Sequence, residues 1–126
     1  MTDIESRTVL RNRLYEAYAS QHAGCRSSEA AALIYRRDIR PALPPCRAGP
    51  VIDIGCGQGE LVRLLLADGY DAEGVDVSPE QVALARAAGL DRVRAGDYRD
   101  VLRKRCGQLA AVTATDLLEH LSLIHI

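Results

Sequence analysis

After Pro50 the sequence alternates between short apolar runs and stretches with helical periodicity, and this alternation constrains the fold more than any other feature. "VIDI" at residues 51–54 reads as a short buried strand, and residues 59–69 carry apolar side chains at helical spacing as far as Gly69. The strand-then-helix order continues to residue 121. Strands that alternate with helices predict a parallel sheet, because parallel strands need long crossover connections.

The remaining elements follow from apolar periodicity and helix-end signals. Further strands are expected at residues 71–77, 91–97 and 109–116, and further helices at residues 78–89, at residues 98–107 and from residue 117. Ser78 is the expected N-cap of the second helix, and Gln81 completes a capping box. We therefore predict the α/β class, as a Rossmann-like three-layer αβα sandwich with an incomplete parallel sheet of about four strands.

Residues 1–49 differ from this pattern and predict an N-terminal helical segment followed by a linker. Residues 2–22 have amphipathic helical spacing, and "SSEAAALIYRRDIR" predicts a second helix that Pro41 closes. "PALPPCRAGP" predicts a stiff linker. Residues 50–120 form the second expected unit, the sheet domain.

Three polar side chains, Tyr15, Tyr18 and His22, fall on one face of the first expected helix. They would line a pocket if this segment is a lid, or form the stripe that docks the helix on the sheet domain. The sequence leaves both alternatives open.

Composition excludes several classes of partner. With 48% apolar residues, 26% charged residues and a net charge of −1, the chain gives no reason to expect nucleic acid or a membrane as partner. Arg36-Arg37 and Arg103-Lys104-Arg105 are expected on solvated helix faces. The four cysteines form no C-x-x-C pair, and the first residues are charged, so a reducing cytoplasm is expected.

The stretch "DIGCGQGE", residues 53–60, is a glycine loop directly after the first strand. It reads G-x-G-x-G, with Glu60 where a dinucleotide fingerprint has its third glycine, and no Lys-Ser or Lys-Thr pair follows as in a P-loop. Glu60 also places a negative charge at a helix start that would otherwise hold a phosphate. The loop therefore predicts close approach of a ligand without a phosphate.

An aspartate stands at or near the end of each expected strand, and ligands of such sheets bind at these ends. A carboxylate presents two oxygens to the vicinal hydroxyls of a ribose, which suits Asp76, and Asp97 is placed to accept from an adenine amine. A single aspartate here is commonly a helix cap or turn residue. Four at corresponding positions, Asp53, Asp76, Asp97 and Asp116, favour a binding site.

The motifs "VIDIGCGQGE", "GVDVSPEQ", "AGDY" and "TATDLLEH" resemble those of the class I S-adenosylmethionine-dependent methyltransferases. The resemblance implies that the glycine loop binds S-adenosylmethionine, with Asp53 bracing the loop and helping to hold the methionine end, and with Asp76 on the ribose. Val77 and Ser78 would lie against the adenine, with Asp97 at its amine and Tyr98 beside it. The full set of implied cofactor-binding residues is Asp53, Gly55, Cys56, Gly57, Gly59, Asp76, Val77, Ser78, Asp97, Tyr98 and Asp116.

His120 is the candidate general base, because it follows the fourth strand beside the expected sulfonium. "DLLEH" also resembles a run that holds a divalent metal in some O-methyltransferases, which would make Asp116, Glu119 and His120 the ligands. The alternative is a helix start with a surface histidine, and we expect no metal.

The predicted function is methyl transfer to a small-molecule acceptor, with oxygen as the expected atom. A nicotinamide-dependent oxidoreductase is the alternative enzyme class, although Glu60 and the absence of a Tyr-x-x-x-Lys motif speak against it. A non-catalytic nucleoside-binding or interaction domain is the third reading.

The last six residues, "LSLIHI" (residues 121–126), also match the translation of a transposon end used in sequencing libraries. We expect this tail to be non-native and the chain to be the cofactor-binding portion of a longer enzyme. The prediction for the isolated chain is poor solubility, self-association and no turnover.

Overall fold

A four-stranded parallel sheet lies at the centre of the computed structural model, which describes residues 28–115. The strands β1 (Val51–Ile54), β2 (Ala72–Asp76), β3 (Val93–Ala95) and β4 (Ala111–Thr113) stand in the order β3-β2-β1-β4. They are connected by the helices α4 (Glu60–Ala67), α5 (Pro79–Ala87) and α6 (Tyr98–Lys104). The predicted Rossmann-like α/β fold is confirmed.

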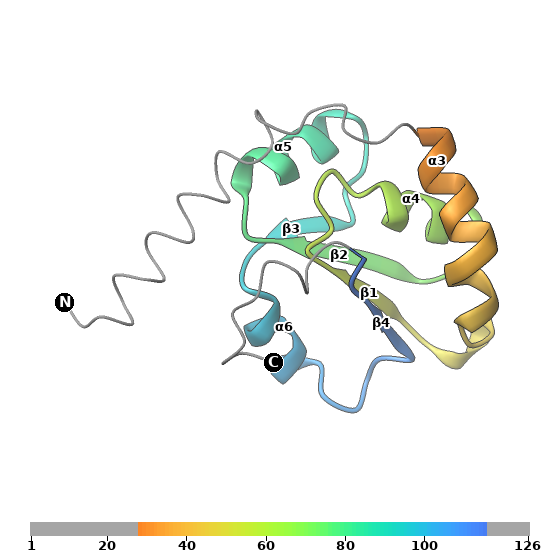
Figure 1. Cartoon of the computed structure of the whole chain (residues 1–126). Coiled ribbons are helices and arrows are strands. Elements are labelled where there is room, and N and C mark those ends of the chain that lie inside the picture. The colour runs from red at the N-terminus through yellow and green to blue at the C-terminus, as the bar shows by residue number, and fades with distance from the viewer. Residues whose placement is uncertain (1–27, 116–126) are drawn as a thin grey trace, which may run out of the picture.

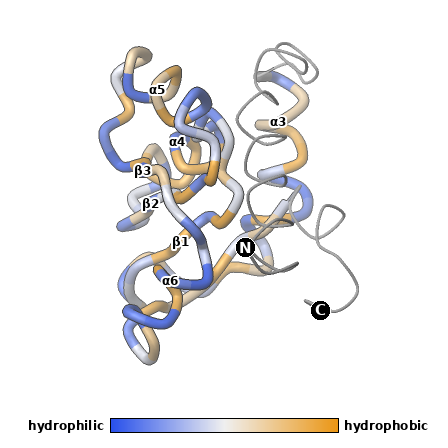
Figure 2. Tube along the Cα trace, turned by 90° about the vertical axis from the view of Figure 1, so that its left-hand side faces the viewer, coloured by the Kyte–Doolittle hydropathy of each residue, from blue (hydrophilic) through white to orange (hydrophobic). Residues whose placement is uncertain are grey.

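Helices cover both faces of this sheet, with α4 and α5 above it and α6 below it in Figure 1. All four residues of β1 are buried, and successive side chains point to opposite faces. Val51 packs in the core under α4 and α5, whereas Ile52 and Ile54 pack in the core against α6. Figure 2 shows α6 alternating between hydrophilic and hydrophobic residues, as expected for a helix that covers one sheet face.

The helical segment before the sheet begins, in the described residues, with α3 (Ser28–Ile34). It continues through a π-helical turn, η1 (Tyr35–Ile39), and the 3-10 turns η2 (Arg40–Ala42) and η3 (Cys46–Ala48). A helix lies before Pro41, as predicted, but Pro41 does not close it, because the helical turns continue through Pro41 to Ala42. Pro41 stands in the first turn of η2, where the missing N–H of proline is tolerated. The first predicted helix, with Tyr15, Tyr18 and His22, lies outside the described residues.

Two tyrosine hydroxyls hydrogen-bond between this segment and the sheet domain. The buried Tyr35 donates from its hydroxyl to Asp68 Oδ2 at 2.6 Å, and the hydroxyl of Tyr70 donates to the Pro44 carbonyl at 2.8 Å. Burial and the neighbouring Asp68 carboxylate raise the pKa of Tyr35, so its hydroxyl remains a donor. The linker is therefore held against the end of α4.

The predicted cap of α5 is half confirmed. The Ser78 hydroxyl accepts from the Gln81 N–H at 3.3 Å, as expected of an N-cap. The second half of the predicted capping box is wrong, because the Ser78 N–H donates to Asp76 Oδ1 at 2.8 Å instead. Gln81 Oε1 is buried and has no hydrogen-bond partner among residues 28–115.

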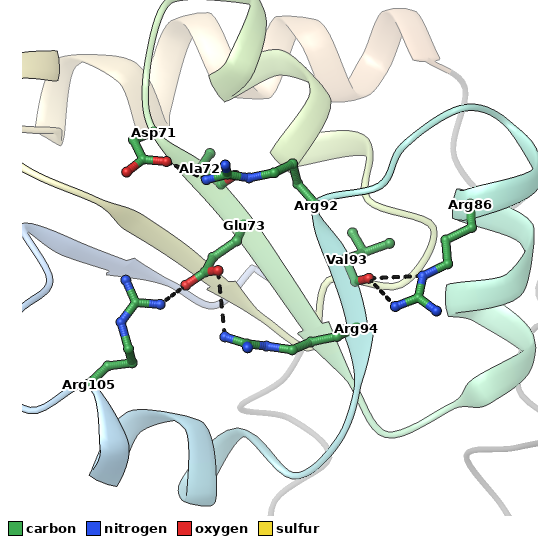
Figure 3. A network of polar contacts seen from close by, with 8 residues as sticks. All are labelled: Asp71, Ala72, Glu73, Arg86, Arg92, Val93, Arg94 and Arg105. Carbon is green, nitrogen blue, oxygen red and sulfur yellow. Dashed lines mark hydrogen bonds and ion pairs between the residues drawn. The ribbon is translucent and has the colours of Figure 1, made fainter.

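Of the basic residues expected on solvated helix faces, Arg105 differs from the prediction, because it forms an ion pair with the sheet. Arg36, Arg37, Arg103 and Lys104 are exposed, as expected. Arg105 instead reaches back to the sheet and pairs with Glu73 of β2, which Arg94 of β3 also approaches at 3.5 Å (Figure 3). A partly buried carboxylate on β2 thus attracts Arg105 away from solvent.

None of the helices between residues 28 and 115 is long and apolar enough to cross a membrane.

Candidate functional site

The glycine loop forms a tight turn between β1 and α4. Gly55, Gly57 and Gly59 have φ values of 68°, 56° and 79°, a left-handed conformation that favours glycine. The N–H groups of Gly55 and Cys56 both donate to the Val75 carbonyl, at 2.8 and 3.1 Å, which ties the start of the loop to β2. The loop is thus held by backbone contacts at the carboxyl ends of β1 and β2.

Two glycines of the loop have different surroundings. A Cβ on Gly59 would lie 2.3 Å from Cδ2 of Leu90, so packing favours glycine at this position in addition to its φ of 79°. Among residues 28–115, and apart from its chain neighbours, a Cβ on Gly57 would meet a single atom within 4 Å, Gln81 Oε1 at 4.0 Å. The described residues therefore leave space beside Gly57, as a ligand in close approach requires.

Asp76, at the end of β2, joins the glycine loop to the start of α5. Its Oδ2 accepts from the Gly57 N–H and its Oδ1 accepts from the Ser78 N–H, each at 2.8 Å. Burial raises the pKa of Asp76, and the two N–H groups oppose that rise. Because a carboxylate has about four acceptor sites, these two bonds leave capacity for ligand hydroxyls.

Asp53 lies in the middle of the sheet, 2% exposed, beside Gly74 of β2 and Thr113 of β4. The Thr113 hydroxyl donates to Asp53 Oδ1 at 2.8 Å. This bond fixes the carboxylate between two strand ends. The backbone N–H of Gly57 donates to Asp76 rather than to Asp53, and the bracing of the loop by Asp53 stays a prediction.

Cys56 is a buried packing residue of the loop. Its burial and the negative charges of Asp53 and Asp76 raise the pKa of its thiol, so the thiolate needed for nucleophilic chemistry is disfavoured. A Cβ on Gly74 would lie 2.7 Å from Cys56 Sγ. The loop therefore packs directly on the bare backbone of β2.

Asp97 is the N-cap of α6, and both of its carboxylate oxygens accept hydrogen bonds within the protein. Its Oδ1 accepts from the Arg99 N–H at 2.9 Å, and the Arg99 guanidinium bonds both carboxylate oxygens, at 3.1 and 2.7 Å. Tyr98 packs, partly buried, against the core under α6. The helix-cap alternative thus holds for Asp97, and its contact with an adenine amine remains a prediction.

Val77 and Ser78 connect β2 to α5. Ser78 is 1% exposed and its hydroxyl serves the helix cap, whereas Val77 is partly exposed. Their position against an adenine remains a prediction.

Asp116, Glu119 and His120 lie outside the described residues. Within residues 28–115, no three His, Cys, Asp or Glu side chains gather as metal ligands.

Three residues that the structure places beside the glycine loop or Asp53 are not among the predicted site residues. Gly74 had a signal, since a glycine inside a strand often marks close approach of another backbone. The spacing between Ser78 and Gln81 predicts a capping box. The sequence does not reveal that the Ser78 N–H donates to Asp76 instead of Gln81. Thr113 lies far from Asp53 in sequence, so the β1–β4 register alone brings them together.

Comparison with known proteins decides the family. A family model described as a methyltransferase domain matches residues 27–125. The chain belongs to this methyltransferase family.

The methyltransferase domain also has curated relatives in bacteria. It is 36% identical over 86 residues to a ubiquinone biosynthesis O-methyltransferase of Xanthomonas campestris, covering 64% of this chain and 35% of the relative. It is 32% identical over 81 residues to the protein of the same description from Xylella fastidiosa, covering 60% and 33%. The chain spans about a third of the length of these relatives.

Solved structures show the same fold. A SAM-dependent methyltransferase from Archaeoglobus fulgidus superposes with a TM-score of 0.70 at 27% identity, covering 86% of this chain and 47% of that one. A structure described for conversion of a disulfide bond into a thioacetal group during echinomycin biosynthesis gives a TM-score of 0.57 at 22% identity, covering 84% and 47%. The second likeness concerns the fold alone.

Proposed function

We propose that this methyltransferase domain binds S-adenosylmethionine at the glycine loop and Asp76, and that its protein transfers the methyl group to an oxygen of a small molecule. The hydrogen bond from the Gly57 N–H to Asp76 Oδ2 carries the proposal, because it joins an open glycine turn to a carboxylate at the end of β2. Family membership and the Archaeoglobus fulgidus structure support the cofactor. The curated relatives, described as O-methyltransferases, support oxygen as the acceptor atom.

The residues present fit such a cofactor. The space that the described residues leave beside Gly57 admits a close ligand, and the Asp76 carboxylate offers acceptors for its hydroxyls. Residues 55–60 contain no lysine or arginine, and Glu60 stands in the first turn of α4. Negative charge at this helix start disfavours a phosphate, which an NAD pyrophosphate would place there, and suits a cationic ligand.

The chain's own contribution to methyl transfer is binding and orientation. The sulfonium supplies an activated methyl group, and its displacement depends chiefly on in-line positioning. In this proposal the loop and Asp76 hold the nucleoside, and Asp53, whose Oδ1 accepts from the Thr113 hydroxyl, contacts the cationic methionine end. His120 is proposed as the general base for a hydroxyl acceptor, and Asp116 as a further cofactor contact; both lie outside the described residues.

Titration calorimetry on the purified, folded chain tests the cofactor. We expect S-adenosylhomocysteine to bind and NAD to show no heat of binding at the same concentrations. The physical reason is the acidic, phosphate-repelling start of α4. Binding of NAD without binding of S-adenosylhomocysteine would refute the proposal and favour an oxidoreductase. Binding of neither ligand would favour an interaction domain that keeps only the fold.

Asp76→Ala is expected to weaken S-adenosylhomocysteine binding by about 1–3 kcal/mol, because hydrogen bonds to a charged acceptor are lost and the Gly57 and Ser78 N–H groups lose their partner. Calorimetry measures the affinity. Asp91→Ala, at an exposed aspartate after α5, is the control and should bind like the wild type. Equal affinities for both variants would show that Asp76 serves the loop but not the ligand.

A further inference from the structure

Gln81 holds a buried acceptor that no group of the described structure satisfies. It lies in the first turn of α5, is 8% exposed, and its Oε1 has no hydrogen-bond partner. Nearly all buried polar atoms in native proteins are hydrogen-bonded, so such an exception calls for a specific reason. The return bond of a capping box is not that reason, because the Ser78 N–H is taken by Asp76.

The unsatisfied oxygen faces the glycine loop. Gln81 Oε1 is the atom that a Cβ on Gly57 would meet, at 4.0 Å, and the N–H of the same Gly57 donates to Asp76 Oδ2. The amide oxygen and the carboxylate therefore both border the backbone of Gly57. A ligand beside Gly57 with two neighbouring donors would meet an acceptor from each side chain.

We propose that Gln81 is a binding residue of the nucleoside site, where its Oε1 accepts a hydrogen bond from one hydroxyl of a ribose whose other hydroxyl is held by Asp76. The inference rests on the proposed function and adds a residue to its site. A vicinal diol offers two donors, which matches two acceptors on separate side chains. The neutral amide adds selectivity for an intact ribose without placing a second charge beside Asp76.

Gln81→Met tests the inference in the 126-residue chain, because methionine keeps the length of the side chain and removes the oxygen. Calorimetry is done with S-adenosylhomocysteine and with its 2′-deoxy and 3′-deoxy analogues. We expect the variant to bind S-adenosylhomocysteine roughly two- to tenfold more weakly, the effect of one lost hydrogen bond. With the analogue that lacks the partner hydroxyl, wild type and variant should bind alike.

Thermal unfolding without ligand separates binding from structure. Removing an acceptor that has no partner should leave the melting temperature unchanged or raise it, whereas a structural role predicts a lower one. Gln108→Met, at an exposed glutamine after α6, is the matched control and should change neither measurement. Gln81→Leu, which also removes the oxygen, replaces the methionine variant if that variant does not fold.

Two outcomes would overturn the inference while the proposed function stands. One is a Gln81→Met variant that binds S-adenosylhomocysteine as tightly as the wild type. The other is a loss of affinity that is equal for the parent ligand and both deoxy analogues, since the ribose would then not be the partner. A wild-type chain that is folded and binds no S-adenosylhomocysteine would refute the proposed function and this inference with it.

Discussion

Gly57→Val is expected to abolish binding of S-adenosylhomocysteine while the helical content stays nearly unchanged. Gly57 has φ +56°, and a β-branched residue in this left-handed region is strained by more than the roughly 1–2 kcal/mol of an ordinary residue. The new side chain would also fill the open space beside the loop and disturb the Gly57 N–H bond to Asp76. Calorimetry measures the binding, and circular dichroism the helical content.

Gly107→Val is the matched control for this prediction. Gly107, after α6, has φ +76°, and no atom of the described residues lies within 4 Å of its Cβ position, so valine there meets similar backbone strain away from the loop. This control should lose stability and keep its affinity. If Gly57→Val keeps the wild-type affinity, the loop is merely a turn and the proposed cofactor site is wrong.

Gly74→Val is expected to lower the free energy of unfolding by about 3 kcal/mol, the upper end of the usual range for overpacking a core. Its Cβ would lie 2.7 Å from Cys56 Sγ, 2.8 Å from Cys56 Cβ and 2.9 Å from Val62 Cγ2. These atoms belong to the loop and to α4, so relief of the clash would displace the loop as well. Urea denaturation measures the stability, and calorimetry the accompanying loss of affinity.

Gly96→Val is the control for the clash at Gly74. Like Gly74, Gly96 has no positive φ, and its Cβ would meet Val75 Cγ2 at 3.7 Å, an ordinary contact. We expect its effect on unfolding to be clearly smaller than that of Gly74→Val. Equal stabilities for Gly74→Val and the wild type would mean that the loop does not pack on β2 as the structure shows.

Much of the fold was predictable because its signals are local. Apolar runs and helical spacing predict the strands and helices after Pro50, and Gly69 and Gly89 each lie two residues after the last residue of α4 and α5. The alternation of strand and helix requires crossover connections, which predict a parallel sheet. Ser78 as an N-cap is likewise a local property, set within one turn of helix.

The partners of the charged side chains were less predictable. Asp97 caps α6 and pairs with Arg99 two residues along the chain, while its contact with an adenine amine stays a prediction. Arg105 was expected in solvent and pairs with Glu73, which lies far away in sequence on β2. A carboxylate or guanidinium takes whichever partner the fold brings within reach, and spacing in the sequence does not reveal which one that is.

The sequence by itself determined the βαβ order, the glycine turn and the aspartates at the strand ends, because each depends on the conformational preferences of neighbouring residues. The tertiary structure decided how these parts join: Asp76 bonded to Gly57, Thr113 to Asp53, and Cys56 packed on Gly74. Each of these contacts spans two strands or a strand and a loop, so it exists only once the parallel register has aligned the strand ends. In the same arrangement the Ser78 N–H donates to Asp76, and the Gln81 oxygen beside the loop has no hydrogen-bond partner among the described residues.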